Sequence, residues 1–228
     1  MKLKLLLLLT ALVLLSWNCH TNNDPAPKQN MRKALSTGID VSHHQGKIDW
    51  KLVEGVDFVY IKATEGATYV DPMLKRNSNG ATEAGIPVGY YHFFRMTSSP
   101  EEQYNNFISS IRNLQCDLIP MVDVETGDGK TRSEVQKNLS IFLELLEKEY
   151  GTKPMIYGTM RSYNTFCSPE FNEYPLYIGR YGSKKPEING DGQYLFWQHS
   201  ENGHITGCDK PVDLCKRNPK SDYSILLP

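Results

Sequence analysis

Residues 118–125 read Leu-Ile-Pro-Met-Val-Asp-Val-Glu, an apolar run that ends in two acids. Such a run predicts a strand that is buried on both faces. Residues two apart on a strand share a face, so Asp123 and Glu125 are expected side by side. Crowding raises the pKa of one carboxyl group, which can then act as a general acid. A solvated strand end is the commoner explanation of an isolated Asp-x-Glu pair, so the rest of the chain has to decide.

Other short apolar runs predict further strands. Most have four to eight residues and are rich in Val, Ile, Tyr and Phe, as buried parallel strands are. They are Gly38–Val41, Phe58–Ala63, Ile86–Phe94, Pro154–Tyr157, Leu176–Ile178 and Tyr194–Trp197. Between them, capping boxes at Ser99–Glu102 and Thr131–Glu134 predict the starts of two amphipathic helices. Alternating strands and helices favour a parallel sheet, either closed into a barrel or open and doubly wound.

The positions of the polar residues favour the barrel. They follow the strand ends, where β/α barrel enzymes keep their active-site residues. These residues are Asp40, Lys62 with Glu65, Tyr91 with His92, Asp123 with Glu125, Tyr157, Arg180, and Gln198 with His199. After Tyr157 the helical stretches become short or absent. We therefore predict an α/β fold, a TIM-like β/α barrel with a reduced number of helices in its second half.

The N-terminus has the features of a signal peptide. Lys2 and Lys4 precede the apolar run Leu5–Leu15, which is too short to span a bilayer but has the length of a signal-peptide core. We interpret residues 1–18 as a signal peptide, so the protein is expected to be exported.

Residues 19–36 are polar and without apolar periodicity, and we interpret them as a flexible tether before one folded domain, residues 37–228. Cys19 directly follows the signal sequence and is a candidate lipidation site. Ser16 and Asn18 depart from the usual lipoprotein pattern, so two locations stay open. The protein is either an outer-membrane or cell-surface lipoprotein, or it is secreted or periplasmic.

Four cysteines remain after Cys19, an even number in an oxidising compartment. Two disulfides are therefore possible, and three pairings are open. The pair Cys208–Cys215 is the shortest link, and Cys116–Cys167 would join two connections of the barrel. The alternative is that some of these cysteines are small buried apolar residues.

Composition excludes several classes of function. A net charge of −1 and a pI near 6.6 argue against a nucleic-acid binder. The adjacent His43 and His44 would point to opposite faces of a strand, and no zinc-binding spacing occurs. No nucleophile elbow of the Gly-x-Ser-x-Gly type is present. We expect neither a metal nor a cofactor.

Several motifs in order resemble glycoside hydrolase family 25, the Chalaropsis-type lysozymes. The resemblance covers nearly all of residues 37–227. The motifs are Gly38–Ser42, Phe58–Gly66, Val88–Phe93, Val122–Glu125, Pro175–Tyr181, Trp197–Ser200 and Val212–Leu214. The family implies a barrel of eight strands with fewer helices than the full (β/α)8 form. It also implies lysozyme activity, which is hydrolysis of the β-1,4 bond between N-acetylmuramic acid and N-acetylglucosamine in peptidoglycan.

The resemblance also assigns roles to residues. It makes Glu125 the proton donor, and it makes Asp123 the charged group that assists the substrate's own acetamido group as nucleophile, with retention of configuration. Asp40 and Asp213 match two further acids of the family site. Strand spacing alone does not separate this mechanism from an inverting one.

The candidates for substrate binding are aromatic and amide side chains at strand ends. Aromatic faces stack on pyranose rings and amides bind hydroxyl groups. We name Tyr91, Tyr157, Trp197 and Gln198, although Tyr157 and Trp197 are nearly as well explained as barrel core. Lys62 and Glu65 either touch substrate or form an ion pair at the pocket rim.

Two alternatives to the muramidase are a catalytically silent barrel that binds the cell wall, and a hydrolase of another acetamido sugar polymer such as chitin. The intact Asp40, Asp123 and Glu125 argue against the first. The longer acidic run of family 18 chitinases is absent before Asp123, which argues against the second. The expected partners are peptidoglycan glycan strands, with no nucleic acid, membrane contact only through a lipid anchor, and a monomeric chain.

Overall fold

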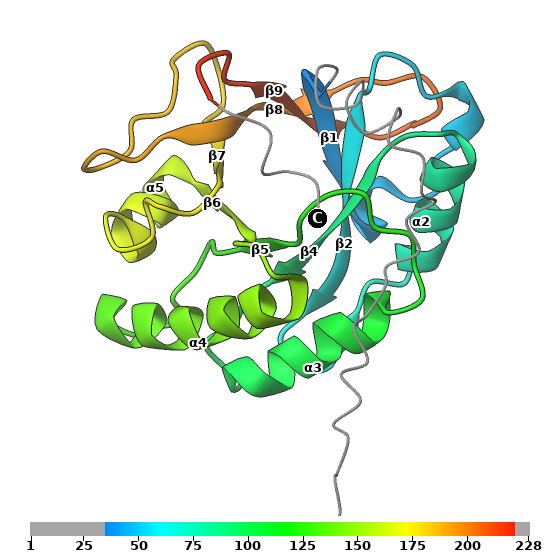
Figure 1. Cartoon of the computed structure of the whole chain (residues 1–228). Coiled ribbons are helices and arrows are strands. Elements are labelled where there is room, and N and C mark those ends of the chain that lie inside the picture. The colour runs from blue at the N-terminus through cyan, green and yellow to red at the C-terminus, as the bar shows by residue number, and fades with distance from the viewer. Residues whose placement is uncertain (1–34, 222–228) are drawn as a thin grey trace, which may run out of the picture.

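The computed structural model of the protein describes residues 35–221. Its centre is a closed barrel of eight strands (Figure 1), in the ring order β1-β9-β8-β7-β6-β5-β4-β2, with β2 paired to β1. The strands are β1 (Thr37–Val41), β2 (Phe58–Glu65), β4 (Val88–Phe93), β5 (Met121–Asp123), β6 (Met155–Thr159), β7 (Leu176–Gly179), β8 (Tyr194–Gly203) and β9 (Val212–Arg217). The predicted α/β barrel is confirmed.

The last strand of the barrel runs in the opposite direction to the others. Six strand pairs are parallel, from β1–β2 through β7–β8, whereas β9 is antiparallel to both β8 and β1. A short strand, β3 (Tyr69–Val70), pairs with the end of β2 outside the ring. We did not predict β9 as a strand, because Val-Asp-Leu-Cys-Lys-Arg mixes buried and exposed residues without a continuous apolar run.

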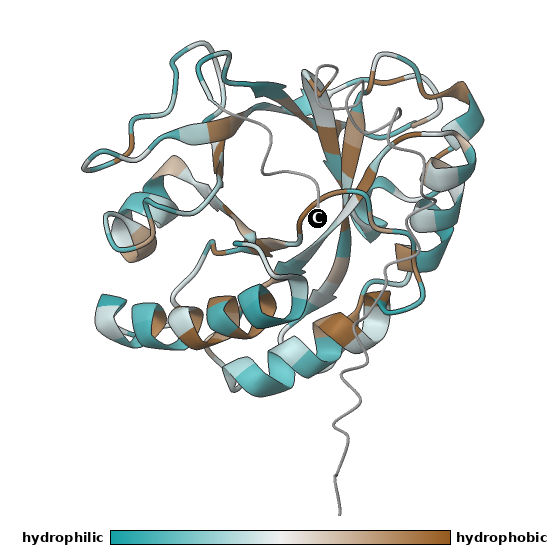
Figure 2. Cartoon of the chain, viewed as in Figure 1, coloured by the Kyte–Doolittle hydropathy of each residue, from teal (hydrophilic) through white to brown (hydrophobic). Residues whose placement is uncertain are grey.

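Helices cover mainly the first half of the barrel. They are α2 (Leu74–Glu83), α3 (Pro100–Ile111) and α4 (Arg132–Tyr150), with one-turn segments η1 (His43–Gln45) and η2 (Trp50–Leu52). Both predicted capping boxes form, at Ser99 and Thr131. After β6 the only helical segments of the described chain are α5 (Met160–Ser162) and η3 (Tyr163–Cys167), as expected for a second half with few helices. Hydrophobic and hydrophilic residues alternate along α3 and α4 (Figure 2), because each helix buries one side.

Alternating side chains on the strands build two apolar cores. On β2, Phe58 and Tyr60 point into the barrel, while Val59 and Ile61 pack on its outside. Gly38 on the neighbouring β1 makes room for the Phe58 ring, since a Cβ atom there would lie 2.2 Å from a ring carbon. Large aromatic rings therefore fill the end of the barrel where the parallel strands begin, and the polar residues lie at the end where these strands finish.

The candidate disulfides are not formed. The four cysteines, Cys116, Cys167, Cys208 and Cys215, are buried thiols. Cys208 belongs to the outer core and Cys215 to the core inside the barrel, so the wall of the barrel separates them. Cys116 donates to the carbonyl of Leu118 at 3.1 Å. These thiols act as small buried apolar groups, the alternative left open by the sequence.

The folded domain begins slightly earlier than predicted. Leu35 is 1% exposed, and the backbone N–H of Ser36 donates to a carboxylate oxygen of Asp57 at 2.9 Å, so these two residues are not part of a free tether. The predicted signal peptide at 1–18 and the candidate lipidation site Cys19 lie outside the described residues. Within residues 35–221, none of the helices has the length and apolarity needed to cross a membrane.

Candidate active site

A cavity of about 200 Å³ opens at the end of the barrel where the parallel strands finish. It brings together the four predicted acids, Asp40, Asp123, Glu125 and Asp213. Asp213 lies near the start of β9, and it reaches the same rim because β9 runs antiparallel to its neighbours. Further lining residues are Ser42, His44, Gln45, Lys62, Tyr91, Phe93, Tyr157, Tyr181 and Gln198.

Asp40 and Asp213 form a carboxyl pair. They lie directly opposite each other on β1 and β9, and a hydrogen bond joins their side chains. Asp40 also accepts hydrogen bonds from the Tyr177 hydroxyl at 2.8 Å and the Gln198 amide at 2.9 Å. Burial, and then the charge of Asp213, raise the pKa of Asp40 well above its usual range. Burial raises the pKa of Asp213 to about 6, so the pair shares one proton near neutral pH.

This pair gives a prediction for stability. The pKa of Asp213 is higher in the folded state than in the unfolded state, so ionised Asp213 lowers the stability of the fold above a pH of about 6. This cost disappears as pH falls from about 6 towards the usual pKa of 3.8. Asp213→Asn is therefore expected to raise the melting temperature at neutral pH, by about 2–4 °C for each kcal/mol regained. Calorimetry across this pH range should show the gain vanish at the acidic end. A gain of constant size would contradict the raised pKa.

Asp123 and Glu125 differ sharply in their surroundings. Asp123 is 5% exposed, and its Oδ1 atom is buried without a hydrogen-bond partner in the described part of the chain. Burial, followed by the charges of Glu125 and Asp40, raises the pKa of Asp123 well above its usual range. Glu125 is exposed at the mouth of the cavity, yet the surrounding walls displace water, and this, followed by the charge of Asp213, raises the pKa of Glu125.

The pKa shifts of Asp123 and Glu125 bear on which of the two carboxyl groups holds the proton. The sequence predicted that one of the two carboxyls holds a proton, and that Asp123 is the ionised one. In the unliganded structure the pKa of Asp123 is raised further than that of Glu125, because Asp123 is the more deeply buried and lacks a donor at Oδ1. An ionised Asp123 therefore needs a hydrogen-bond donor that enters the cavity from outside.

Lys62 lies between the acids and a neighbouring charge network. Its Nζ atom is 2.8 Å from Glu65 and 4.9 Å from the centre of the Phe93 ring. The ion pair, one of the two alternatives from the sequence, is therefore present, and Glu65 lies outside the cavity that holds the acids. Because Lys62 is a cation on the cavity wall, it lowers the pKa values of Asp123 and Glu125 and partly offsets the effect of burial.

Tyr91, Tyr157 and Gln198 line the cavity as predicted. The Gln198 amide, however, is used within the protein: its oxygen accepts from the Tyr157 hydroxyl at 2.7 Å and its nitrogen donates to Asp40. Gln198 is 2% exposed. It therefore orients Asp40 rather than presenting a free amide to a sugar.

The model of "Glycosyl hydrolases family 25" matches residues 39–208. The chain belongs to glycosyl hydrolase family 25.

The chain is similar to the autolytic lysozyme of Clostridium acetobutylicum, with 34% identity over 179 residues, which is 78% of this chain and 54% of that protein. Lysozyme M1 of Streptomyces globisporus is 32% identical over 207 residues, 83% of this chain and 70% of that protein. The solved structure of a family 25 glycosyl hydrolase from Bacillus anthracis has a TM-score of 0.74 at 31% identity, covering 83% of this chain and 91% of that chain. This family 25 protein is a glycoside hydrolase of the lysozyme type.

Trp197 of this family 25 hydrolase does not line the cavity. Side chains alternate along β8, so Phe196 and Gln198 point into the barrel and Trp197 points outward. Its indole N–H donates to the carbonyl of Arg180 at 2.6 Å, and the Nζ atom of Lys216 lies 4.3 Å from the centre of its ring. Trp197, a predicted sugar contact, therefore packs on the outside of the barrel wall and away from the residues that line the cavity.

Sequence reasoning missed two tyrosines of the family 25 site. Tyr177 donates to Asp40, and Tyr181 lines the cavity with 46% of its surface exposed. Both belong to the motif Pro175–Tyr181 quoted above. The period of two on β7 could have placed Tyr177 on the inward face, but Tyr181 lies beyond the end of that strand.

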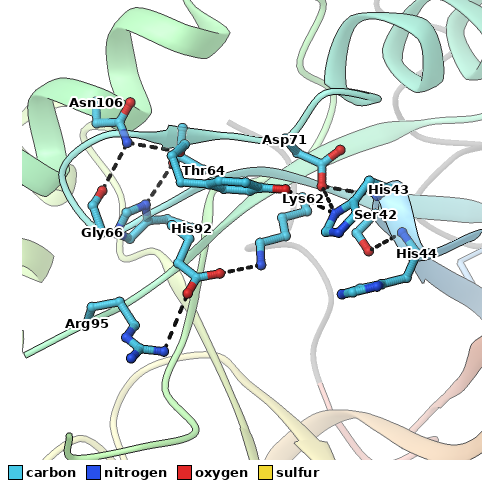
Figure 3. Close-up of polar contacts among 12 residues, drawn as sticks. Ser42, His43, His44, Lys62, Thr64, Gly66, Asp71, His92, Arg95 and Asn106 are labelled. Atoms are coloured by element: carbon cyan, nitrogen blue, oxygen red, sulfur yellow. Dashed lines mark hydrogen bonds and ion pairs between the residues drawn. The ribbon is translucent and has the colours of Figure 1, made fainter. Parts of the chain in front are cut away.

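Within the described residues of this hydrolase, no group of three or more His, Cys, Asp or Glu side chains is arranged to hold a metal ion. His43 instead lies with its Nδ1 atom 2.8 Å from the buried Asp71 carboxylate (Figure 3). His44 lines the cavity beside Lys62, and partial burial, followed by the neighbouring His43, lowers its pKa.

Proposed function

We propose that the protein is a muramidase, which hydrolyses the β-1,4 bond between N-acetylmuramic acid and N-acetylglucosamine in peptidoglycan. One observation carries the proposal: an accessible Glu125 with a raised pKa adjoins a buried Asp123 with one unpartnered oxygen. The two lysozyme relatives support the same class of substrate.

Glu125 is the proton donor in this proposal. Its carboxyl O–H gives a proton to the bridging glycosidic oxygen while the bond from that oxygen to C1 of the muramic acid breaks. The raised pKa of Glu125 favours the protonated form at the start of the step. After the leaving sugar departs, the Glu125 carboxylate takes a proton from the water that attacks C1.

Asp123 assists the nucleophile. The carbonyl oxygen of the substrate's 2-acetamido group attacks C1 and forms a cyclic oxazolinium ion, which water then opens, so that two inversions give net retention. The acetamido N–H is the donor that the unpartnered Oδ1 atom of Asp123 lacks in the free protein. This hydrogen bond lowers the pKa of Asp123 on binding, and the resulting negative charge stabilises the cationic ring.

The remaining groups orient the site and bind the sugars. Asp40, held by Tyr177 and Gln198, shares a proton with Asp213 and can contact the attacking water or a hydroxyl group. Tyr91 and Tyr157 line the cavity, and the exposed Tyr181 offers an aromatic face at its rim. One chain supplies all of these groups, so we propose that the protein acts as a monomer.

The N-terminal sequence places this activity outside the cytoplasm in our proposal. Residues 1–18 act as the signal peptide, and Cys19 is the candidate for a lipid anchor, with secretion or a periplasmic location as the alternative. The polar residues after Cys19 would then let the barrel reach the wall.

The release of new reducing ends from purified peptidoglycan tests the proposal. We expect the wild-type protein to release them with time. A silent wall-binding barrel would instead bind to the insoluble wall without releasing any. A hydrolase of another acetamido sugar polymer would release reducing ends from that polymer, such as chitin, and none from peptidoglycan.

A further inference from the structure

A second, open cavity of about 570 Å³ adjoins the active-site cavity. We call it the side groove; its lining includes His43, Lys62, Glu65, Tyr69, Arg95 and Ser98. Lys62 and His44 line both cavities, so the two cavities lie next to each other. The walls of the side groove come from η1, the turn between β2 and β3, and the loop after β4 (Figure 3).

One wall of the side groove carries alternating charges. Glu65 bridges Lys62, at 2.8 Å, and Arg95, at 3.4 Å, and Arg95 also contacts Asp128 at 3.0 Å. The Arg95 side chain is 33% exposed, so its guanidinium group is fixed by two carboxylates yet open to solvent. A guanidinium group presents five N–H donors, which exceeds what these two contacts use. This wall can therefore pair with a ligand carboxylate or with peptide carbonyls.

The other wall is apolar and firmly held. Tyr69 on β3 lines the groove and is 38% exposed, which is unusual for a large apolar side chain among the described residues. Asn106 from α3 donates to the carbonyls of Gly66 and Tyr69, at 2.9 and 3.1 Å, and so holds the turn in place (Figure 3). The surface is thus pre-formed and offers an exposed apolar side chain to a ligand.

We propose that the side groove binds the peptide stem that peptidoglycan carries on the lactyl group of N-acetylmuramic acid. The inference rests on the proposed muramidase function, because it places a muramic acid in the adjoining cavity. The stem is a short chain of amides with small methyl side chains and free carboxylates. The methyl groups match the exposed ring of Tyr69, the carboxylates and amide carbonyls match the guanidinium group of Arg95, and Lys62 lines both cavities.

Two variants of the side groove test this inference. Tyr69→Ala removes an exposed aromatic contact, and Thr97→Trp narrows the groove from its other side. Each is compared on intact peptidoglycan and on glycan strands from which an amidase has removed the peptides. Leu52→Ala serves as the matched control, since Leu52 is also an exposed apolar residue, at 51%, and lines neither cavity.

The measured quantity is the ratio of kcat/KM on peptide-bearing substrate to kcat/KM on peptide-free substrate. We expect this ratio to fall about tenfold in Tyr69→Ala and in Thr97→Trp, and to stay at the wild-type value in Leu52→Ala. A ratio that both variants leave unchanged would overturn the inference, even if overall activity drops. If the wild-type protein cleaves neither substrate, the proposed muramidase function itself fails, which is a separate result.

Discussion

Replacing Glu125 with glutamine is expected to reduce kcat/KM for release of reducing ends from peptidoglycan by about 10²–10⁴-fold. Glutamine keeps the size of the side chain but has no proton to give to the leaving oxygen. The loss should appear in kcat, because the proton moves only in the transition state. The matched control is Glu144→Gln on α4. Glu144 is an exposed glutamate that does not line the cavity.

The fold of the Glu125→Gln variant should be intact. Glu125 is exposed at the cavity mouth, and no buried hydrogen bond within residues 35–221 depends on it. The melting temperature of the variant should therefore stay within a few degrees of the wild-type value. The wild-type enzyme should lose kcat/KM as pH rises through the raised pKa of Glu125, since only the protonated form donates. Activity of the variant near the wild-type level would remove Glu125 from the role of acid.

Replacing Asp123 with asparagine is expected to lower kcat by about 10²–10³-fold. The amide cannot carry the negative charge that orients the acetamido group and stabilises the ring cation. At the same time the variant should be more stable than the wild type at neutral pH, because a buried carboxyl with a raised pKa and an unpartnered oxygen costs folding free energy. Loss of activity with gain of stability is a combination that a purely structural residue does not give.

The control for this variant is Asp191→Asn, an exposed aspartate in the loop before β8, which should change neither property. Proton magnetic resonance of early products adds a test of the mechanism. Assistance by the acetamido group predicts that the β-anomer of the new reducing end forms first. The α-anomer first, or an active Asp123→Asn variant, would contradict the proposed role of Asp123.

The strand alternation explains how far the sequence could predict this site. Asp123 and Glu125 were placed by their spacing of two, and both lie in the cavity. The same alternation on β8 places Gln198 inside the barrel and Trp197 outside it. Aromatic character alone suggested a sugar contact for Trp197, but the direction of the side chain decides.

Other features could not be predicted from local patterns. The reversal of β9 is set by its pairing with both β1 and β8, which lie far apart in sequence, and only this pairing brings Asp213 opposite Asp40. Helix α2 begins without a side-chain cap, and its buried face includes the polar residues Asn77 and Ser78, so neither a capping motif nor an apolar stripe marks it in the sequence. The cysteines had the right number for disulfides, but pairing depends on distance in space, and the fold buries all four as thiols.

The two pKa shifts at the end of β5 also depend on the tertiary structure. The spacing in the sequence predicts that the two acids are close, but it does not predict which of them is buried away from solvent. The barrel buries Asp123 and leaves Glu125 at the mouth, so the accessible acid is the one positioned to reach a glycosidic oxygen. The buried acid is left with an open acceptor that fits an amide donor from the substrate.

Mass spectrometry of the products from purified peptidoglycan tests the central proposal most directly. The products are reduced with borohydride, which marks the sugar that carries each new reducing end. We predict reduced N-acetylmuramic acid at these ends, appearing with the wild-type protein and absent with Glu125→Gln. Reduced N-acetylglucosamine at the new ends, or no products at all from the wild-type protein, would contradict the proposal.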